Sequence, residues 1–581
     1  MSVAATPCDE GVVRGTRPCA PCGQSAEPWV IVAAAAGSGM AFLDSTVLNV
    51  ALPAIQADLD ATGSQVQWIY GAYALVVAAF LLVGGSLGDH LGRRRVFAVG
   101  VALFGVASAW SALAAGPGQL IAARAVQGAG GALMVPGALA IIGASFEEER
   151  RARAIGLWAA LSGLAMAVGP VLGGFLVENV SWRAAFLLNP PVAVAVLLVA
   201  LRRVPESRDP EAGRLDFAGA VLATLGLGGV VYGLIRSSSA GLGDPAVLFA
   251  LGVGAVGLVL FVVAEGRGRR PMVPLVLFKS RTFDGASLYT LLFYLGLTGS
   301  LYFVPFLLVQ VHGHPATVAG VVFLPFVAAA LLLGRFSGRI VGRYGLRTLL
   351  VAASLATAAG FLLFAVPGAD GGPPHWSAFA PAMVVQGFGM ALVIAPLTTA
   401  ALNSVDGDHA GLASGVNNAV ARTAGLLAVA LFAVLLSTAF SAGLDSRVED
   451  IPLSPAERMS LEAEKANLGA ASAPEGVDAA TRARIEEAVA EAFVGGFRLV
   501  MVVAAGLALA SALVAALMIR GGAAKVLARS ARELSPEATP TAGRGIVGGA
   551  VSRRTPRGSP GETVRSGDAP ARRQDSAVGQ T

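Results

Sequence analysis

The sequence of 581 residues is short of charge. Only 14% of its residues are Asp, Glu, Lys or Arg, whereas soluble domains carry about 25%. Hydrophobic residues make up 55%, and the mean hydropathy is +0.69. This composition excludes an ordinary soluble protein and predicts an all-α polytopic membrane protein, because a membrane-spanning helix needs about 20 largely apolar residues.

Cysteine and histidine are scarce as well. The three cysteines, Cys8, Cys19 and Cys22, all precede residue 29, and the first histidine is His90. A structural zinc site takes four ligands, so we expect free thiols on a tail and no metal or cofactor. The first 28 residues also lack the apolar core of a signal peptide, so the first span is expected to direct membrane insertion.

Lysine occurs three times against 39 arginines, so arginine fixes the orientation of the chain. Short cytoplasmic loops carry an excess of positive charge. Eighteen Lys and Arg residues fall on one side of the apolar runs, and only Arg183 and Arg236 fall in short loops on the other. We therefore expect both termini in the cytoplasm of a bacterial cell, and we read the pI of 9.4 as loop placement rather than nucleic-acid binding.

Fourteen apolar runs are long enough to span a bilayer. They divide into a first bundle of six spans (29–201), a loop with two inserted spans (202–270) and a second bundle of six (271–520). A tail precedes them (1–28), a disordered tail follows them (521–581), and a polar segment (439–495) lies in the second bundle on the outer face. We expect that segment to be a solvated connector with one or two surface helices, and a lid over an outer vestibule is the alternative. The approximate limits of the spans are 29–51, 66–87, 96–115, 119–145, 154–177, 184–201, 216–235, 246–264, 286–309, 316–338, 348–366, 377–400, 411–438 and 497–519.

Acidic residues are almost absent from the interior of these runs, and Asp44 is the exception. It lies in LDSTVLNVALP, at the end of the first apolar run. An ionisable group at such depth is costly and usually functional, so proton or substrate handling is the first hypothesis. The alternative is a carboxylate that only ties two helices together or caps a break at Pro53.

A second motif, GSLGDHLGRRR, follows the second span and contains Asp89, Gly92, Arg93, Arg94 and Arg95. Its glycines allow two helix ends to approach closely, and Asp89 is placed to accept hydrogen bonds from a helix N-terminus. GRFSGRIVGRYGLR follows the second span of the second bundle. A repeat of this kind is typical of transporters whose two halves move about a central site.

The fourth and fifth spans carry further polar and small residues. In LIAARAVQGAGGA, Arg124 and Gln127 share one helical face. Arg124 lies about 9 Å from the outer end of its span and Asp44 about 13 Å from the outer end of its own, so the two side chains can meet. In the fifth span, GLAMAVGPVLGG allows close helix packing and a bend; its residues of interest are Gly163, Gly169, Pro170, Gly173 and Gly174.

Together these motifs resemble the major facilitator superfamily, and specifically its fourteen-span drug:proton antiporter branch, over roughly residues 29–520. The resemblance implies two six-helix bundles and secondary active efflux driven by protons. It also implies that Asp44 and Arg124 are linked to proton transfer, that Asp89, Gly92 and Arg93 to Arg95 form a conformational latch, and that Gly169 with Pro170 carries the antiporter signature.

Contacts to a small-molecule substrate are less well specified by the sequence. Tyr294 and Tyr302 belong to an aromatic stripe that can line a ligand site or simply pack. Gln127, Gln386, Asn417 and Arg422 are further polar candidates at membrane depth. We expect a monomer in the lipid bilayer and no enzyme, since no nucleophile and base set or phosphate loop is present. A dedicated exporter of one metabolite and a non-transporting sensor remain alternatives.

Overall fold

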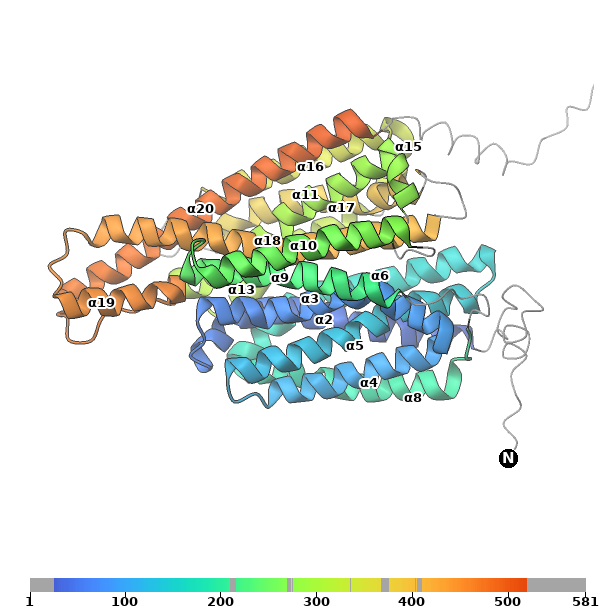
Figure 1. Ribbon diagram of the computed structural model, residues 1–581, viewed down its shortest axis with the longest axis horizontal. Helices are drawn as coiled ribbons and strands as arrows, with labels where there is room; N and C mark the ends of the chain where they lie inside the picture. The colour runs from blue at the N-terminus through green and yellow to red at the C-terminus, as the bar shows by residue number, and fades with distance from the viewer. Residues whose placement is uncertain are drawn as a thin grey trace, which may run out of the picture. The chain divides into compact units, whose positions relative to one another are not determined.

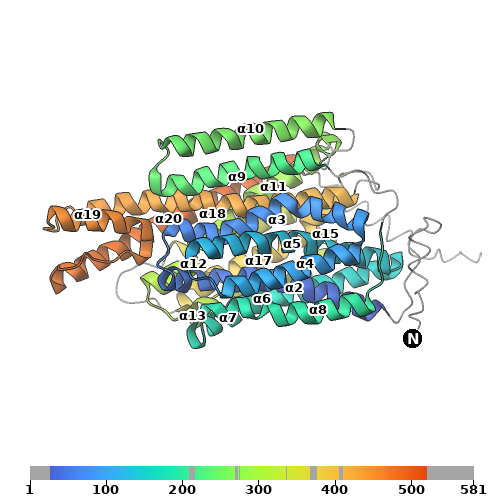
Figure 2. The same ribbon diagram turned by 60° about the horizontal axis from the view of Figure 1, so that its bottom comes forward.

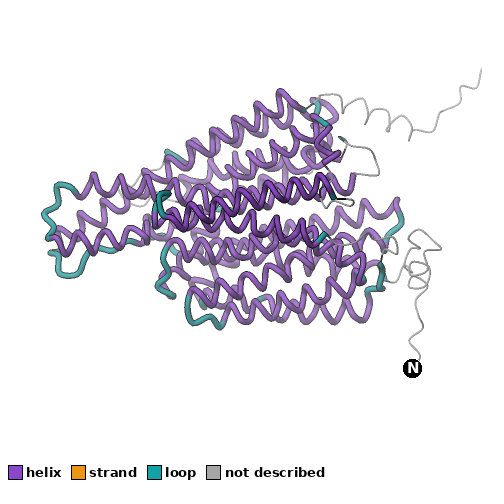
Figure 3. The backbone as a smooth tube through the Cα atoms, viewed as in Figure 1, coloured by secondary structure: helices purple, strands orange, loops and turns teal. Residues whose placement is uncertain are grey.

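The computed structural model describes residues 26–208, 216–268, 273, 275–334, 336–366, 376–402, 404 and 410–519. These residues contain helices and no strands, as Figure 3 shows. The three cysteines and the tail 521–581 lie outside the described residues. The elements of the first bundle and the inserted pair are α2 (Glu27–Asp58), α3 (Gly63–Leu91), α4 (Arg93–Ala112), α5 (Pro117–Ser145), α6 (Glu148–Asn179), α7 (Trp182–Leu187), α8 (Asn189–Arg203), α9 (Phe217–Ala240) and α10 (Pro245–Arg267).

The second bundle contains more interruptions than the first. Its elements are η1 (Leu275–Lys279), α11 (Arg281–Tyr302), α12 (Val304–Phe306), η2 (Leu307–Val311), α13 (Ala316–Val321), α14 (Leu324–Gly334), α15 (Ser337–Tyr344), α16 (Leu346–Phe364), η3 (Trp376–Phe379), α17 (Ala380–Leu402), α18 (Ala410–Val448), α19 (Pro455–Glu464), η5 (Lys465–Ala470) and α20 (Ala479–Met518).

Among the described residues, thirteen helices or helix pairs are long and apolar enough to cross a membrane, and α17 contributes a shorter apolar stretch, Ala380–Val393. Each of the fourteen apolar runs therefore coincides with helix. Helix is the conformation expected there, because hydrocarbon offers the backbone no other hydrogen-bond partner. The predicted span 316–338 is divided into α13 and α14, because Pro325 has no N–H to continue the first helix.

The two inserted helices pack as a pair against the boundary between the bundles. α9 lies against both α3 and α18, and α10 lies on the far side of α9 (Figures 1 and 2). The contact is apolar: Val231 and Ile235 of α9 are buried against Leu426 and Ala430 of α18. The inserted pair thus covers one of the two seams between the bundles.

The predicted internal repeat has a backbone counterpart. Gly92 is the residue between α3 and α4, with a φ of +110°. Gly345 is the corresponding residue between α15 and α16, with a φ of +81°. These values lie in the region that glycine adopts without steric cost. Each bundle therefore turns through a glycine after its second span.

The polar segment 439–495 contains a surface helix, as expected, and in addition the continuations of both flanking spans. α18 continues to Val448, and α20 begins at Ala479. Between them, Ser454 caps α19 through a capping box with Glu457. Charged residues at helical spacing therefore prolong α18 and α20 beyond their apolar runs.

This extension also contacts the first bundle. Gln56 of α2 donates to the backbone oxygen of Asn467 at 3.4 Å and accepts from Gln310 at 3.0 Å. A Cβ on Gly63 would lie 2.7 Å from the backbone oxygen of Ala466. The expected solvated connector is therefore packed on those ends of α2 and α3 that the arginine count predicts to lie on the outer face, called the outer ends below.

Candidate functional site

A buried ion pair lies inside the first bundle. Nη1 of Arg124 on α5 donates to Oδ2 of Asp44 on α2 at 2.6 Å, and both residues are buried. The guanidinium lies over the ring of Tyr73, 4.4 Å from its centroid. The contact between Asp44 and Arg124 that the depth estimate predicts is confirmed. Removing one partner of such a buried ion pair destabilises a protein strongly, because the other charge stays buried alone.

Two buried amides complete the surroundings of the carboxylate. Nε2 of Gln127 and Nδ2 of Asn189 each donate to Oδ1 of Asp44 at 2.9 Å. Asn189 also donates to the hydroxyl of Ser108 at 2.8 Å, and Oε1 of Gln127 accepts from Arg124 at 2.6 Å. Four helices, α2, α4, α5 and α8, therefore meet in one hydrogen-bonded network.

The network fits the ionised form of Asp44. Three donors, from Arg124, Gln127 and Asn189, point at its two oxygens, and an ionised carboxylate is an acceptor only. A proton on Oδ1 would compete with the donors from Gln127 and Asn189, and a proton on Oδ2 would remove the charge that pairs with Arg124.

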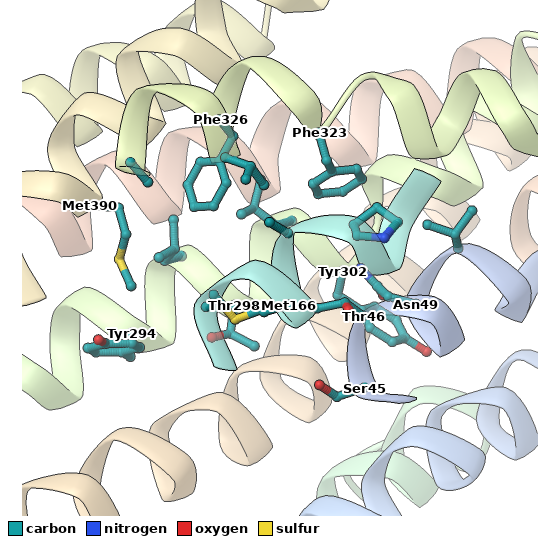
Figure 4. Close-up of a pocket in the computed structure, with 18 of the residues that line it drawn as sticks. Ser45, Thr46, Asn49, Met166, Tyr294, Thr298, Tyr302, Phe323, Phe326 and Met390 are labelled. Carbon is teal, nitrogen blue, oxygen red and sulfur yellow. The ribbon is translucent and has the colours of Figure 1, made fainter. Parts of the chain in front are cut away.

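A cavity of about 440 Å³ lies next to this network, between the two bundles. Ser45 and Thr46, which follow Asp44 on α2, line it on the first-bundle side, and Tyr294 and Tyr302 of α11 line it on the other (Figure 4). The wall is mainly apolar, as is usual for ligand pockets. Other lining residues include Asn49, Met166, Thr298, Phe323, Phe326 and Met390.

Two polar atoms in this wall are left over. Oδ1 of Asn49 and the hydroxyl of Tyr302 are buried and have no hydrogen-bond partner among the described residues. Buried polar groups are normally paired, since an unpaired one costs about 1–3 kcal/mol. The two atoms can therefore receive a ligand's polar groups inside an otherwise apolar cavity.

The glycines of the fifth span bring α6 close to α2. A Cβ on Gly169 would collide with the side chain of Thr46, and one on Gly173 would lie 3.0 Å from the Cα of Val47. Gly163 differs, because nothing lies within 4 Å of its Cβ position and it lines the cavity. The motif thus combines tight packing with an open cavity wall.

The same motif joins the two bundles at their outer ends. A Cβ on Gly174 would lie 2.8 Å from the Cα of Thr317 in α13, and one on Gly320 would collide with the backbone oxygen of Pro170. The backbone N–H of Thr317 also donates to Glu178 at 3.1 Å. The outer ends of α6 and α13 are therefore closed against each other.

The loop motif is held by a carboxylate that the sequence analysis does not identify. Asp89 pairs with Arg93, one turn further on, at 2.8 Å. The hydrogen bond expected from a helix N-terminus goes to Glu206 instead, whose Oε1 accepts from the backbone N–H of Arg94 at the start of α4 at 2.9 Å. An acid at this position complements the positive end of the helix dipole.

Glu206 follows α8 and fixes the end of that helix to the loop motif. Arg94 and Arg95 lie 3.6 Å from its Oε2, and Arg94 donates to the backbone oxygen of Val204 at 3.0 Å. The carboxyl carbon of Glu206 would lie 2.8 Å from a Cβ on Gly92. Only glycine therefore permits this approach at the positive φ that the turn adopts.

Comparison with known proteins places this arrangement in a family. The model of the Major Facilitator Superfamily matches residues 34–429. The chain belongs to the major facilitator superfamily. It is 32% identical over 85% of its length to the tetracenomycin C resistance and export protein of Streptomyces glaucescens, covering 92% of that protein. It is 36% identical over 72% of its length to a puromycin resistance protein of Streptomyces alboniger, covering 83%.

A solved structure agrees with the family assignment. The chain matches a bacterial homologue of the human lysosomal transporter Spinster, in an inward-facing and occupied conformation, with a TM-score of 0.57 at 18% identity. The match covers 86% of this chain and 98% of the other. With its apolar helices, the chain is a multi-pass transporter of the bacterial cell membrane.

In this major facilitator protein, only some of the predicted substrate residues line the cavity. Tyr294 and Tyr302 do, whereas Gln127 belongs to the Asp44 network. Asn417 is buried and accepts from Thr290 at 2.7 Å. Gln386 is buried and Arg422 half-buried, and neither is among the residues lining the cavity. A substrate role for these side chains remains a prediction.

Sequence reasoning missed three members of the sites. Asn189 stands before two prolines and reads as a turn residue, and Ser108 is one small hydroxyl in an apolar span. Glu206 lies in a polar loop where acids are common. A search for polar residues at the depth of Asp44 on every span of the first bundle would have found Ser108 and Asn189.

Proposed function

We propose that this chain is a proton-coupled antiporter that exports amphipathic small molecules, such as drugs or antibiotics, across the cell membrane. Asp44 and Arg124 carry proton coupling, and the cavity beside them receives the substrate. The main support for the proposal is that α2 contacts both the buried network and the cavity. Its Asp44 belongs to the buried network, while the next residues, Ser45 and Thr46, line the cavity.

Coupling follows from the hydrogen bonds around Asp44. The ionised carboxylate holds α2, α5 and α8 in the arrangement that has the outer ends of α6 and α13 closed. A proton on Asp44 removes the charge that attracts Arg124 and leaves that buried guanidinium without a counter-charge, so the protonated form favours a different arrangement. Proton and substrate then prefer opposite states, which is the requirement for exchange.

The cavity supports amphipathic substrates. Its wall offers aromatic and aliphatic surface from Tyr294, Phe326 and Met390, together with the unpaired atoms of Asn49 and Tyr302. Apolar area gives affinity without strict geometry, and a few polar groups fix orientation. The relatives named for resistance to tetracenomycin C and puromycin are consistent with such compounds.

A resistance and accumulation assay tests the proposal. A susceptible host that expresses the chain is expected to accumulate less puromycin and related amphipathic compounds than the same host expressing Asp44→Asn. Collapse of the proton gradient should abolish the difference. Equal accumulation in both strains across the whole panel would contradict export.

The second candidate is an exporter of one endogenous compound. One relative is named for the export of a single compound, tetracenomycin C, which favours this reading. The same panel separates the candidates, because a dedicated exporter protects against one compound whereas a multidrug exporter protects against chemically unrelated ones. A non-transporting sensor would protect against none.

A further inference from the structure

An apolar groove of about 320 Å³ runs along the outside of the first bundle, between α2 and α8. Its walls are small or branched side chains, including Ala36 on α2 and Ala195 on α8. Val32 is 48% exposed and Val192 38% exposed. In a membrane protein such a surface faces lipid tails, so the groove lies open to the bilayer.

The groove continues in helical register to one end of both helices. Trp29, Val32 and Ala36 are spaced i, i+3 and i+7 on α2, and Val192, Ala195, Val199 and Arg203 follow the same spacing on α8. The guanidinium carbon of Arg203 lies 5.5 Å from the centroid of the Trp29 ring. An aromatic and a cationic side chain therefore meet across the end of the groove, the pairing typical of a membrane interface.

This end of the groove carries unbalanced positive charge. Arg202 and Arg203 are exposed and form no ion pair with any residue in the described part of the chain. The acid at the start of α2, Glu27, is paired with Arg150 at 2.8 Å. The hydrogen bond from Arg94 to the backbone of Val204 holds the end of α8 in place, so the two arginines project from a fixed position.

We propose that this groove, with Arg202 and Arg203, is a binding site for an anionic glycerophospholipid of the arginine-rich membrane face. One acyl chain lies along the groove, and the phosphate is held by the two arginines beside the ring of Trp29. The groove from Pro191 to Val199 is about 12 Å long, close to the roughly 15 Å of one hydrocarbon leaflet. The site is independent of the transported substrate.

Lipid titration of the purified full chain, followed by native mass spectrometry, tests the site. Phosphatidylglycerol is expected to bind more tightly than phosphatidylcholine with the same acyl chains. Arg203→Gln should weaken phosphatidylglycerol binding roughly fivefold, and the double variant with Arg202→Gln roughly 25-fold, since each arginine contributes to attraction of an anionic headgroup. Ala195→Trp should weaken binding by filling the groove, with Ala195→Leu as a milder variant if the first does not fold.

The matched control is Arg267→Gln at the end of α10, an exposed arginine on a helix that does not line the groove. It should leave phosphatidylglycerol binding unchanged, and glycerol 3-phosphate should bind far more weakly than the lipid. An equal loss in Arg267→Gln and Arg203→Gln would show unspecific attraction and overturn the proposal. Equal binding of phosphatidylcholine, or of glycerol 3-phosphate, would overturn it as well.

Discussion

Three donors converge on one carboxylate in the interior of the first bundle, two on Oδ1 and one on Oδ2 of Asp44. Three of its about four acceptor positions are therefore occupied. Arg124 supplies the charge, whereas Gln127 and Asn189 supply neutral donors to Oδ1, so a proton on Asp44 affects the ion pair more than the amide contacts. The network can thus respond to one proton without any long-range signal.

Asp44 and Arg124 should behave as one unit in stability. Removing either partner leaves a buried charge alone, at a cost of about 3–5 kcal/mol, whereas Asp44→Asn with Arg124→Gln leaves neutral groups that can bond to each other. We expect the double variant to be little less stable than either single one, with a coupling energy of about 1–3 kcal/mol. Thermal unfolding of the four proteins in detergent measures this, and additive effects would mean that the pair contributes no coupling.

At the scale of helices, two contacts hold the observed arrangement: the outer seam between α6 and α13, and the attachment of α8 to the start of α4. Both depend on glycines that allow backbones to approach. Gly174 and Gly320 close the seam, and Gly92 lets Glu206 reach the loop motif. Changes at these positions should shift conformational populations rather than remove the cavity.

Opening of the outer seam is the prediction for Gly174→Leu. The added side chain would overlap α13 in the closed state, where overpacking costs about 1–3 kcal/mol, and a bias of that size changes the populations about five- to 150-fold. A cysteine introduced as Asn49→Cys, with the native cysteines replaced by serine, should react faster with an impermeant thiol reagent added outside. Gly156→Ala, on the same helix with open space around it, should not change the rate.

The attachment of Glu206 should matter at least as much as the Asp89 pair. Asp89 forms a half-exposed ion pair, a class of interaction that contributes about 0.2–1 kcal/mol, whereas Glu206 accepts from a helix N-terminus, which contributes about 0.5–2 kcal/mol. We expect Glu206→Gln to slow transport as much as Asp89→Asn or more, with substrate affinity retained. Transport rate and equilibrium binding measured together decide this: affinity falling in step with rate would place both acids in substrate binding. Glu147→Gln is the control, because the ion pair of this acid among the described residues is with partly exposed Arg150.

At the scale of the whole molecule, the outer ends of the bundles are held together by contacts from three directions. α6 meets α13, Gln56 meets Gln310, and η5 packs on the ends of α2 and α3. The inserted pair covers the seam between α3 and α18. Exchange between the two membrane faces then requires the outer contacts to separate while the inserted pair keeps its seam covered.

Much of this architecture is predictable from the sequence, and the reasons are physical. Apolar runs mark helices because hydrocarbon leaves the backbone no other partner, and depth along a helix follows from its rise per residue, which is why the Asp44–Arg124 contact could be predicted. Glu206 could not be predicted, since its partner lies 112 positions away in a contact that depends on how helices pack, whereas Asn189 could have been found from its depth along its span. Within 439–495 the sequence predicts one or two surface helices, but not that α18 and α20 continue beyond their apolar runs, because hydropathy marks only the part of a helix that lies in hydrocarbon.

The central claim is that Asp44 carries the proton that is exchanged for substrate, and substrate-stimulated proton release from reconstituted vesicles tests it most directly. With puromycin as the first substrate, the wild type is expected to release protons in a concentration-dependent way. Asp89→Asn should release them more slowly, whereas Asp44→Asn should remain folded and release none, because an amide cannot titrate. Proton release by Asp44→Asn equal to that of the wild type would contradict the account.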